Sequence, residues 1–135
     1  SENGEESVFC YRGDGIGLNQ LLERGFDLYV ISSEINSLVK KRCEKLKINC
    51  IHSVENKGNI IKSILKSKFL KKENAAFIGN DINDIPAFQN ASLTIGVNDR
   101  NPLIDDYISY LTHKSGGNGA VREVCDNIIS LLDDQ

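Results

Sequence analysis

The sequence predicts an α/β fold with a mainly parallel sheet covered by helices on both faces. Short apolar segments alternate with segments whose apolar residues recur at helical spacing, almost from one end of the chain to the other. Strands that alternate with helices in this way form parallel βαβ units. The chain has 135 residues, enough for one domain with a hydrophobic core and too few for two. We therefore expect residues 1–135 to form a single domain.

In the first half of the chain, runs of apolar residues predict strands, and apolar residues three and four positions apart predict helices. A cluster of glycines is typical of a turn. The predicted elements, in order, are a strand over 8–11, a turn over 12–15 leading into a helix that ends near residue 23, a strand over 26–31, a helix over 36–46, a brief strand over 50–52 and a helix over 57–70.

The second half repeats the alternation. The predicted elements are a strand over 75–78, a polar loop, a short helix to about residue 90, strands over 93–97 and 107–111, and a helix over 120–132. The run Gly116-Gly117-Asn118-Gly119 separates the last strand from the last helix.

Composition excludes several classes of protein. The net charge of −3 argues against broad binding to nucleic-acid phosphates. No apolar run is long enough for a membrane span, so we expect no membrane partner. The four cysteines show no Cys-x-x-Cys spacing, and His52 and His113 complete no metal signature. We expect a reduced, cytoplasmic chain.

The most informative segment is 78–86, Ile-Gly-Asn-Asp-Ile-Asn-Asp-Ile-Pro. It places carboxylate and amide side chains directly after an apolar strand, at the sheet edge where open α/β folds bind ligands. Such oxygen ligands suit Mg²⁺. The alternative is a turn followed by a helix N-cap, because Asn and Asp favour both roles.

Three polar positions follow predicted strands in the order Ser32, Lys57 and 80–84. A hydroxyl, an ammonium group and a magnesium-type cluster together make a phosphate site. Each also has a structural explanation: Ser32 could cap the next helix, and Lys57 could be solvated in the first turn of its helix, where the dipole disfavours a cation.

These positions resemble the haloacid dehalogenase-type phosphatases, whose second, third and fourth motifs match Ser32, Lys57 and 79–84. The similarity is strongest to the capless branch, which contains 3-deoxy-octulosonate 8-phosphate phosphatases and the C-terminal domain of bacterial acylneuraminate cytidylyltransferases. The segments 12–17 and 117–123 also fit this branch. The resemblance implies a Rossmann-like fold without a large cap and a Mg²⁺ cofactor. It implies these site residues: catalytic Ser32, Lys57 and Asp84, and metal ligands Asn80 and Asp81.

Order along the chain argues against a receiver domain, the other phosphate-binding fold with an acidic loop. In a receiver domain the acidic residues come first, whereas here the acidic loop follows Ser32 and Lys57.

Two features depart from the family pattern. Asn80 stands where the family usually has an aspartate, which lowers the negative charge offered to Mg²⁺. The first motif, an Asp-x-Asp that supplies the nucleophile on the central strand, does not occur before Asp81. Without it no aspartyl-phosphate can form, so we expect the chain as written to be inactive.

The missing strand would also leave unpaired edges on the strands that end at Ser32 and Ile78. Three explanations are open: the chain is a fragment, which we favour, a partner supplies the strand, or the sheet closes differently.

The resemblance also suggests a substrate. Ser33-Glu34 replaces the Gly-Arg of the eight-carbon sugar-acid enzymes and is similar to the nine-carbon, sialic-acid-type 9-phosphate phosphatases. In a helical projection Glu34 and Lys45 point nearly the same way, with Arg42 less than a quarter-turn away. The predicted substrate-binding residues are Ser33, Glu34, Arg42, Lys45 and Gly117. A solvated helix face of mixed charge is the alternative.

We therefore expect a magnesium-dependent sugar-acid phosphatase domain, associated with CMP-sialic acid synthesis and assembled as a homotetramer. The alternative is a non-catalytic tetramerisation domain of an acylneuraminate cytidylyltransferase.

Overall fold

The computed structural model describes residues 12–135. The strand predicted over 8–11 lies outside the described residues. These residues divide into two compact units, one formed by residues 12–53 together with 113–135 and the other by residues 54–112. We call them the terminal unit and the middle unit and describe each by itself.

The terminal unit contains a two-stranded parallel sheet and three helices. Its elements are α1 (Arg12–Glu23), β1 (Tyr29–Ile31), α2 (Ser37–Leu46), β2 (Asn49–Ile51) and α5 (Ala120–Asp133). In the sheet, Tyr29 lies opposite Asn49 and Ile31 opposite Ile51. Asn36 caps α2, because its side-chain oxygen accepts hydrogen bonds from the backbone N–H groups of Leu38 and Val39.

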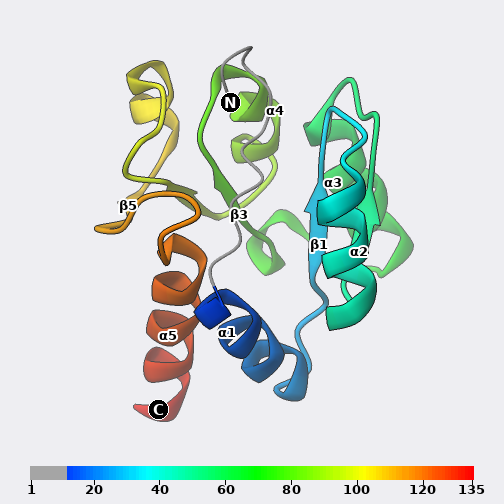
Figure 1. The fold of residues 1–135 in the computed structure, drawn as a ribbon. Coiled ribbons are helices and arrows are strands. Elements are labelled where there is room, and N and C mark those ends of the chain that lie inside the picture. Colours follow the sequence, from blue (N-terminus) through cyan, green and yellow to red (C-terminus); the bar gives the residue numbers. More distant parts are fainter. Residues whose placement is uncertain (1–11) are drawn as a thin grey trace. The chain divides into compact units, whose positions relative to one another are not determined.

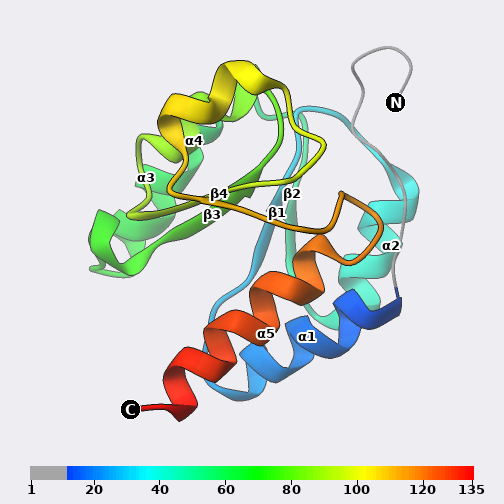
Figure 2. The same cartoon turned by 90° about the vertical axis from the view of Figure 1, so that its left-hand side faces the viewer.

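Helix α1 begins at Arg12, so the prediction of a turn over 12–15 was wrong. Gly17, which follows this segment, serves close packing between helices. A Cβ at Gly17 would lie 2.8 Å from Cβ of Cys125, and α1 and α5 lie side by side in both ribbon views (Figures 1 and 2). Only a residue without a side chain lets the two helices approach this closely.

The middle unit contains a three-stranded parallel sheet in the order β3-β4-β5. Its elements are α3 (Lys57–Ser67), the 3₁₀ turn η1 (Lys72–Asn74), β3 (Ala76–Gly79), the 3₁₀ turn η2 (Ile82–Asp84), α4 (Ile85–Phe88), β4 (Leu93–Gly96), the 3₁₀ helix η3 (Pro102–Tyr107) and β5 (Tyr110–Leu111). Phe88, Ile95 and Ile104 are buried in its core. Phe77 meets Phe88 edge to face, with ring centroids 5.4 Å apart.

Two predicted boundaries in this unit were wrong. The predicted strand over 107–111 is shortened to β5, because η3 runs from Pro102 to Tyr107 and buries Ile104 completely. Helix α3 ends at Ser67, since Phe69 takes a left-handed conformation with φ of 56°. The spacing of apolar residues alone predicted a strand that starts too early and a helix that ends too late.

All strand pairs in the described part of the chain are parallel, which confirms the predicted α/β fold class. Within residues 12–135, β1 pairs with β2 alone and β3 with β4 alone. Among these described residues, β1 and β3 therefore each have one edge without a strand partner. The expectation of a single domain stays a prediction. No helix in residues 12–135 is both long and apolar enough to span a bilayer.

Candidate functional site

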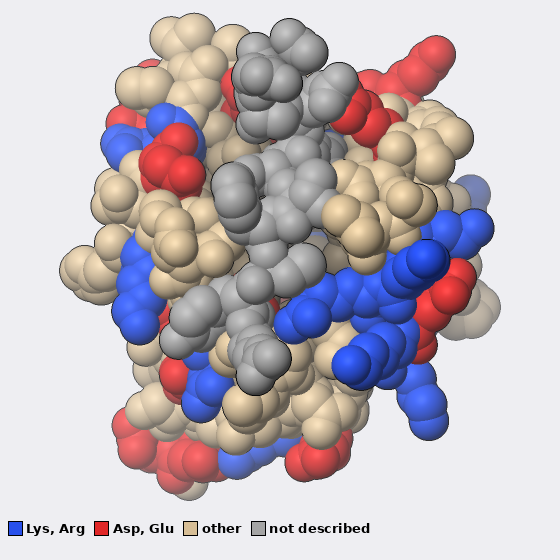
Figure 3. Space-filling model, viewed as in Figure 1, with Lys and Arg blue, Asp and Glu red and all other residues tan. Residues whose placement is uncertain are grey.

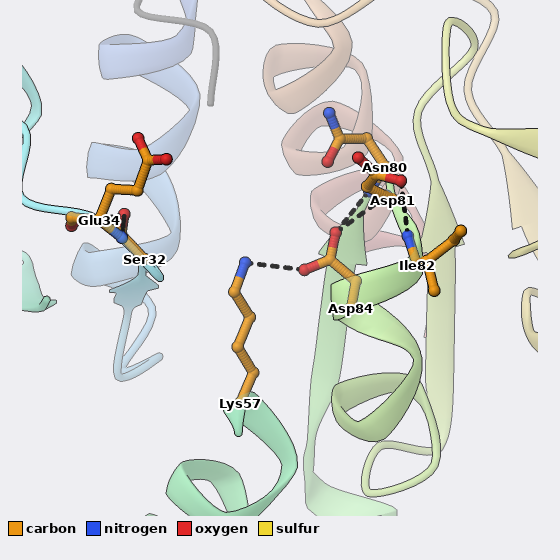
Figure 4. Close-up of polar contacts among 7 residues, drawn as sticks. All are labelled: Ser32, Glu34, Lys57, Asn80, Asp81, Ile82 and Asp84. Carbon is orange, nitrogen blue, oxygen red and sulfur yellow. Dashed lines mark hydrogen bonds and ion pairs between the residues drawn. The ribbon is translucent and has the colours of Figure 1, made fainter. Parts of the chain in front are cut away.

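The carboxylate of Asp84 is the centre of a hydrogen-bonded cluster at the end of β3. Its Oδ2 accepts the backbone N–H of Asn80 at 2.8 Å and that of Asp81 at 3.1 Å (Figure 4). The strand ends in a glycine for a steric reason, because a Cβ at Gly79 would lie 2.7 Å from Oδ2 of Asp84. The loop that follows β3 is therefore wrapped around one buried carboxylate.

Lys57 forms an ion pair with this carboxylate. Its Nζ lies 2.8 Å from Oδ1 of Asp84, and the two side chains are only 7% and 3% exposed. The alternative of a solvated Lys57 was therefore wrong. Close packing of α3 against α4 supports this position of Lys57, since a Cβ at the next residue, Gly58, would lie 2.5 Å from the backbone oxygen of Pro86, near the start of α4.

The electrostatics of this pair are costly for a purely structural element. Lys57 is the first residue of α3, where the helix dipole disfavours a cation. Removing two charges from water costs several kcal/mol per ion before their attraction is counted, and a well-packed apolar pair is often as stable. A buried ion pair at the end of a strand is therefore a candidate functional group.

Asn80 and Asp81 are the predicted metal ligands, and they fit a Mg²⁺ ion only in part. Asp81 also caps η2, because its Oδ1 accepts the N–H of Ile82 at 2.7 Å, so the predicted N-cap alternative is observed as well. Both oxygens of Asp84 are engaged within the cluster. No group of three or more His, Cys, Asp or Glu in residues 12–135 is placed to hold a metal. Mg²⁺ would need further oxygens from water, phosphate or a third carboxylate.

Asn101 belongs to this cluster and was missed in the sequence. Its side-chain Nδ2 donates to Oδ1 of Asp81 at 3.3 Å, and its backbone N–H donates to the carbonyl oxygen of Asn80 at 2.8 Å. The residue follows β4 in the chain, so it lies in the loop after the strand next to β3. Its position at the carboxyl end of a neighbouring parallel strand was the signal that could have identified it.

Ser32 lies directly after β1 in the terminal unit and is 2% exposed. Its backbone N–H donates to the carbonyl oxygen of Ile51 at 2.9 Å. Its hydroxyl accepts the N–H of Glu34 at 3.1 Å and lies 2.9 Å from the carbonyl oxygen of the same residue. Since Asn36 caps α2, the alternative that Ser32 caps this helix was wrong.

The other predicted substrate-binding residues of this unit are more exposed. Ser33 and Glu34 are exposed and precede α2, so the helical projection that aligned Glu34 with Lys45 was wrong. Arg42 is half-buried and Lys45 exposed. Basic side chains gather over α2 in the space-filling view (Figure 3). The helix and its C-cap contribute Lys40, Lys41, Arg42, Lys45 and Lys47.

Gly117 lies in the turn before α5 and has φ of 75°, a left-handed conformation that favours glycine. The same turn ends at Gly119, the N-cap residue of α5. Glu123 fixes the incoming chain, because its carboxylate accepts the backbone N–H groups of His113 and Lys114 at 2.9–3.0 Å. No ligand role for Gly117 follows from these contacts, and its assignment stays a prediction.

Asp14 caps α5 from another helix, a role that the sequence did not reveal. Its Oδ1 accepts the N–H of Arg122 at 3.0 Å, one of the first-turn donors that Gly119 leaves without a side-chain partner. Burial is the largest influence and raises the pKa of Asp14, although the hydrogen bond from Arg122 and the nearby Arg42 act in the opposite direction.

The structure thus brings Lys57, Asn80, Asp81 and Asp84 together in the middle unit. Ser32, Ser33 and Glu34 adjoin one another after β1 in the terminal unit. The catalytic, metal-binding and substrate-binding roles of these residues remain predictions.

Comparison with known proteins gives a consistent result. The profile of the haloacid dehalogenase-like hydrolases matches residues 27–124. The 3-deoxy-D-manno-octulosonate 8-phosphate phosphatase KdsC of Salmonella typhi is 33% identical over 130 residues, which cover 94% of this chain and 68% of that protein. KdsC of Yersinia pestis is 30% identical, with coverage of 96% and 70%.

Solved structures agree. The 3-deoxy-D-manno-octulosonate 8-phosphate phosphatase from Moraxella catarrhalis, in complex with magnesium, phosphate and KDO, superposes with a TM-score of 0.85 at 32% identity and covers 89% of this chain and 70% of that one. A related protein from Vibrio cholerae gives a TM-score of 0.87 at 31% identity, with coverage of 100% and 76%. The chain belongs to the haloacid dehalogenase-like hydrolases and is related to their 3-deoxy-D-manno-octulosonate 8-phosphate phosphatases.

Proposed function

We propose that this chain is the phosphate- and magnesium-binding part of a phosphatase domain that acts on a sugar-acid phosphate. The buried Lys57–Asp84 ion pair at the end of β3 carries the proposal. A lysine held by a buried carboxylate can present its ammonium group to a phosphate oxygen. The relatives named above support the reaction class, since they are phosphatases of an eight-carbon sugar-acid phosphate.

Each residue of the cluster has a distinct task in this proposal. Asp84 orients Lys57 and also fixes the loop backbone through the N–H groups of Asn80 and Asp81. Lys57 neutralises charge on the phosphate. Asn80 and Asp81 would hold Mg²⁺, which supplies further charge neutralisation when bound. Ser32 stays the predicted hydroxyl of the second motif.

Turnover needs a nucleophile that these residues do not provide. In the family an aspartate of an Asp-x-Asp motif attacks phosphorus, and no such motif precedes Asp81 in the printed sequence. We therefore expect these 135 residues to bind phosphate and Mg²⁺ without hydrolysing a phosphomonoester. A longer protein that carries the motif is expected to release phosphate.

The favoured substrate is a nine-carbon, sialic-acid-type 9-phosphate, in association with CMP-sialic acid synthesis. The exposed Glu34 can accept hydrogen bonds from sugar hydroxyl groups, and Arg42 can bind a carboxylate bidentately. Competition between KDO 8-phosphate and a nine-carbon 9-phosphate for the same chain tests this choice. Tighter binding of the eight-carbon compound contradicts it.

A second candidate is a non-catalytic tetramerisation domain of an acylneuraminate cytidylyltransferase. It is favoured by apolar side chains exposed just before and in the first turn of α2. Ile35 is 77% exposed and Leu38 is 61% exposed. Such residues suit a contact between subunits.

Calorimetric titration with inorganic phosphate, with and without MgCl₂, separates the two candidates. The first predicts phosphate binding that Mg²⁺ strengthens and that Asp81→Asn weakens. Asp106→Asn is the matched control, because Asp106 is an exposed carboxylate on η3. Absence of phosphate binding, together with a stable tetramer in native mass spectrometry, contradicts the first candidate and supports the second.

A further inference from the structure

Helix α3 ends in a turn that carries an exposed aromatic side chain among lysines. Phe69 is 96% exposed, and the next residue, Leu70, is 42% exposed. Residues 66–73 contain four lysines and one glutamate, although the whole chain has a net charge of −3. This segment is therefore a local positive surface on an acidic chain. We call the exposed residues Lys66, Phe69, Leu70, Lys71 and Lys72 the basic tip.

Hydrogen bonds fix the backbone of the basic tip. The N–H of Leu70 donates to the carbonyl oxygen of Leu65 at 2.9 Å, and the N–H of Phe69 donates to that of Lys66 at 3.2 Å. This pair of bonds is the Schellman motif, which ends many helices. The residues that follow enter η1, whose N-cap is Lys71. The exposed side chains therefore project from an ordered turn.

Phe69 occupies the position of this motif that glycine favours. It has φ of 56°, a left-handed conformation that strains a residue with a bulky side chain. A ring that is 96% exposed buries little surface within the described part of the chain, so it stabilises the fold little. Strained backbone at an exposed aromatic residue is a mark of a functional surface.

The composition of the basic tip favours an anionic lipid surface over an acidic protein as its partner. Residues 66–73 contain four lysines and no arginine. Protein interfaces are depleted in lysine and enriched in arginine, whereas lysine clusters are attracted to the negative charge of leaflets that contain phosphatidylserine. Phe and Leu side chains enter the boundary between headgroups and acyl chains, while lysine ammonium groups stay among the headgroups. A protruding ring needs no preformed pocket in such a partner.

We propose that the basic tip is a docking surface for an anionic lipid membrane, with Phe69 inserted at the lipid interface and the lysines held at the headgroups. An apolar side chain and a polybasic patch together give weak, reversible attachment. The sequence-based expectation of no membrane partner rested on the length of apolar runs, which bears on spanning a bilayer and not on attachment to its surface.

The basic tip and the proposed phosphate site lie at opposite ends of α3. The helix begins at Lys57 and ends at Ser67, which separates the two by about 15 Å along the helix axis. Within the middle unit, docking through the tip therefore leaves the Lys57–Asp84 pair clear of the lipid. The inference does not depend on the proposed function.

Sedimentation with sucrose-loaded vesicles tests the docking surface. The chain of 135 residues is mixed with phosphatidylcholine vesicles that contain about 30% phosphatidylserine, and separately with vesicles of phosphatidylcholine alone. We expect binding to the anionic vesicles that falls steeply when NaCl is raised to about 0.5 M, and little binding to the neutral ones. Equal binding to both kinds of vesicle, or binding to neither, overturns the proposal.

Phe69→Gly separates docking from folding. Glycine relieves the left-handed strain, so thermal unfolding should occur at the temperature of the parent or above it. The partition coefficient for anionic vesicles should fall about tenfold, because no ring enters the lipid. Leu103→Ala is the matched control and should bind like the parent, since Leu103 is 69% exposed on η3, which also carries Asp105 and Asp106. A Phe69→Gly variant that binds vesicles like the parent overturns the proposal.

Lys71→Gln/Lys72→Gln tests the contribution of charge. Loss of each lysine near an anionic surface weakens attachment about fivefold, so the double variant should bind about 25-fold more weakly. Lys40→Gln/Lys41→Gln removes the same charge from exposed positions of α2 and should bind within about twofold of the parent. Equal losses in the two variants overturn the proposal, because net charge would then govern binding. Retention on immobilised poly-glutamate without any binding to vesicles would assign the tip to an acidic protein and overturn lipid docking.

Discussion

The ends of β3 and β1 carry similar polar residues, but the structure builds them differently. After β3, Asp84 is buried, holds a buried lysine and accepts two backbone N–H groups. After β1, Ser32 is buried, but the neighbouring Ser33 and Glu34 are exposed. The first region is fixed by a network, whereas most of the second faces solvent. In our account the rigid region performs the phosphate chemistry common to the family and the exposed region selects the sugar acid.

The largest expected effect comes from breaking the network at its centre. Asp84→Leu leaves Lys57 buried without its carboxylate and removes the acceptor for two N–H groups, which should cost about 3–5 kcal/mol. Urea unfolding followed by circular dichroism measures the loss. Asp106→Leu, which replaces an exposed carboxylate, is expected to change the midpoint little. Equal losses in the two variants would contradict the description of Asp84.

Substitutions at two glycines, one in each unit, test how tightly the helices of the two units are packed. Gly58→Ala forces a Cβ to within 2.5 Å of the backbone oxygen of Pro86, and overpacking of this kind costs about 1–3 kcal/mol. Gly15→Ala in α1 meets only ordinary contacts at 3.4 Å, and alanine favours a helix over glycine by about 1 kcal/mol. Thermal unfolding should therefore show destabilisation for the first and none for the second. The opposite order would show that the close approach of α3 and α4 is misplaced.

Helix caps offer a matched pair of smaller changes. Asn36 caps α2 and Asn56 caps α3 through the same kind of side-chain hydrogen bond. Each Asn→Ala change should cost about 1 kcal/mol. Asn56 adjoins Lys57, so Asn56→Ala should also weaken phosphate binding in calorimetry, whereas Asn36→Ala should not. Equal binding by both variants would indicate that Lys57 does not depend on the start of its helix.

The smallest expected effects are opposite slopes of stability with pH. Burial raises the pKa of Asp14, so the folded protein binds more protons than the unfolded chain as pH rises through that pKa, and stability falls. The hydrogen bond from Arg100 lowers the pKa of Asp105, so its contribution is present above the ordinary aspartate range and lost as pH falls through the lowered pKa. Asp14→Asn and Asp105→Asn should each remove one slope from the unfolding free energy measured between pH 3 and 7. Parallel profiles for the two variants would contradict these assignments.

The sequence predicted much of this arrangement because local patterns determine it. The apolar spacing of 57–67 and the apolar run before Gly79 identified α3 and β3. The sequence misplaced the start of α1, because a cluster of glycines is typical of a turn and gives no sign that one of them, Gly17, lies between two packed helices. The burial of Lys57 was also hidden, since it depends on Asp84, which is 27 residues away.

Asn101 and the cap that Asp14 provides for Arg122 were missed for a similar reason. The two residues of that cap lie 108 positions apart, and only the folded chain brings such partners together. Periodicity identifies the elements, but it carries no information about pairs that are distant in the sequence.

The most direct test of the central claim replaces the ion pair with a neutral pair of similar size. In Lys57→Met/Asp84→Asn, the amide oxygen can still accept the two N–H groups, so the free energy of unfolding should stay close to that of the parent. Calorimetric titration of the same variant with phosphate and MgCl₂ should show that binding is lost. A variant that is strongly destabilised but still binds phosphate would show that the pair is structural and would contradict the account.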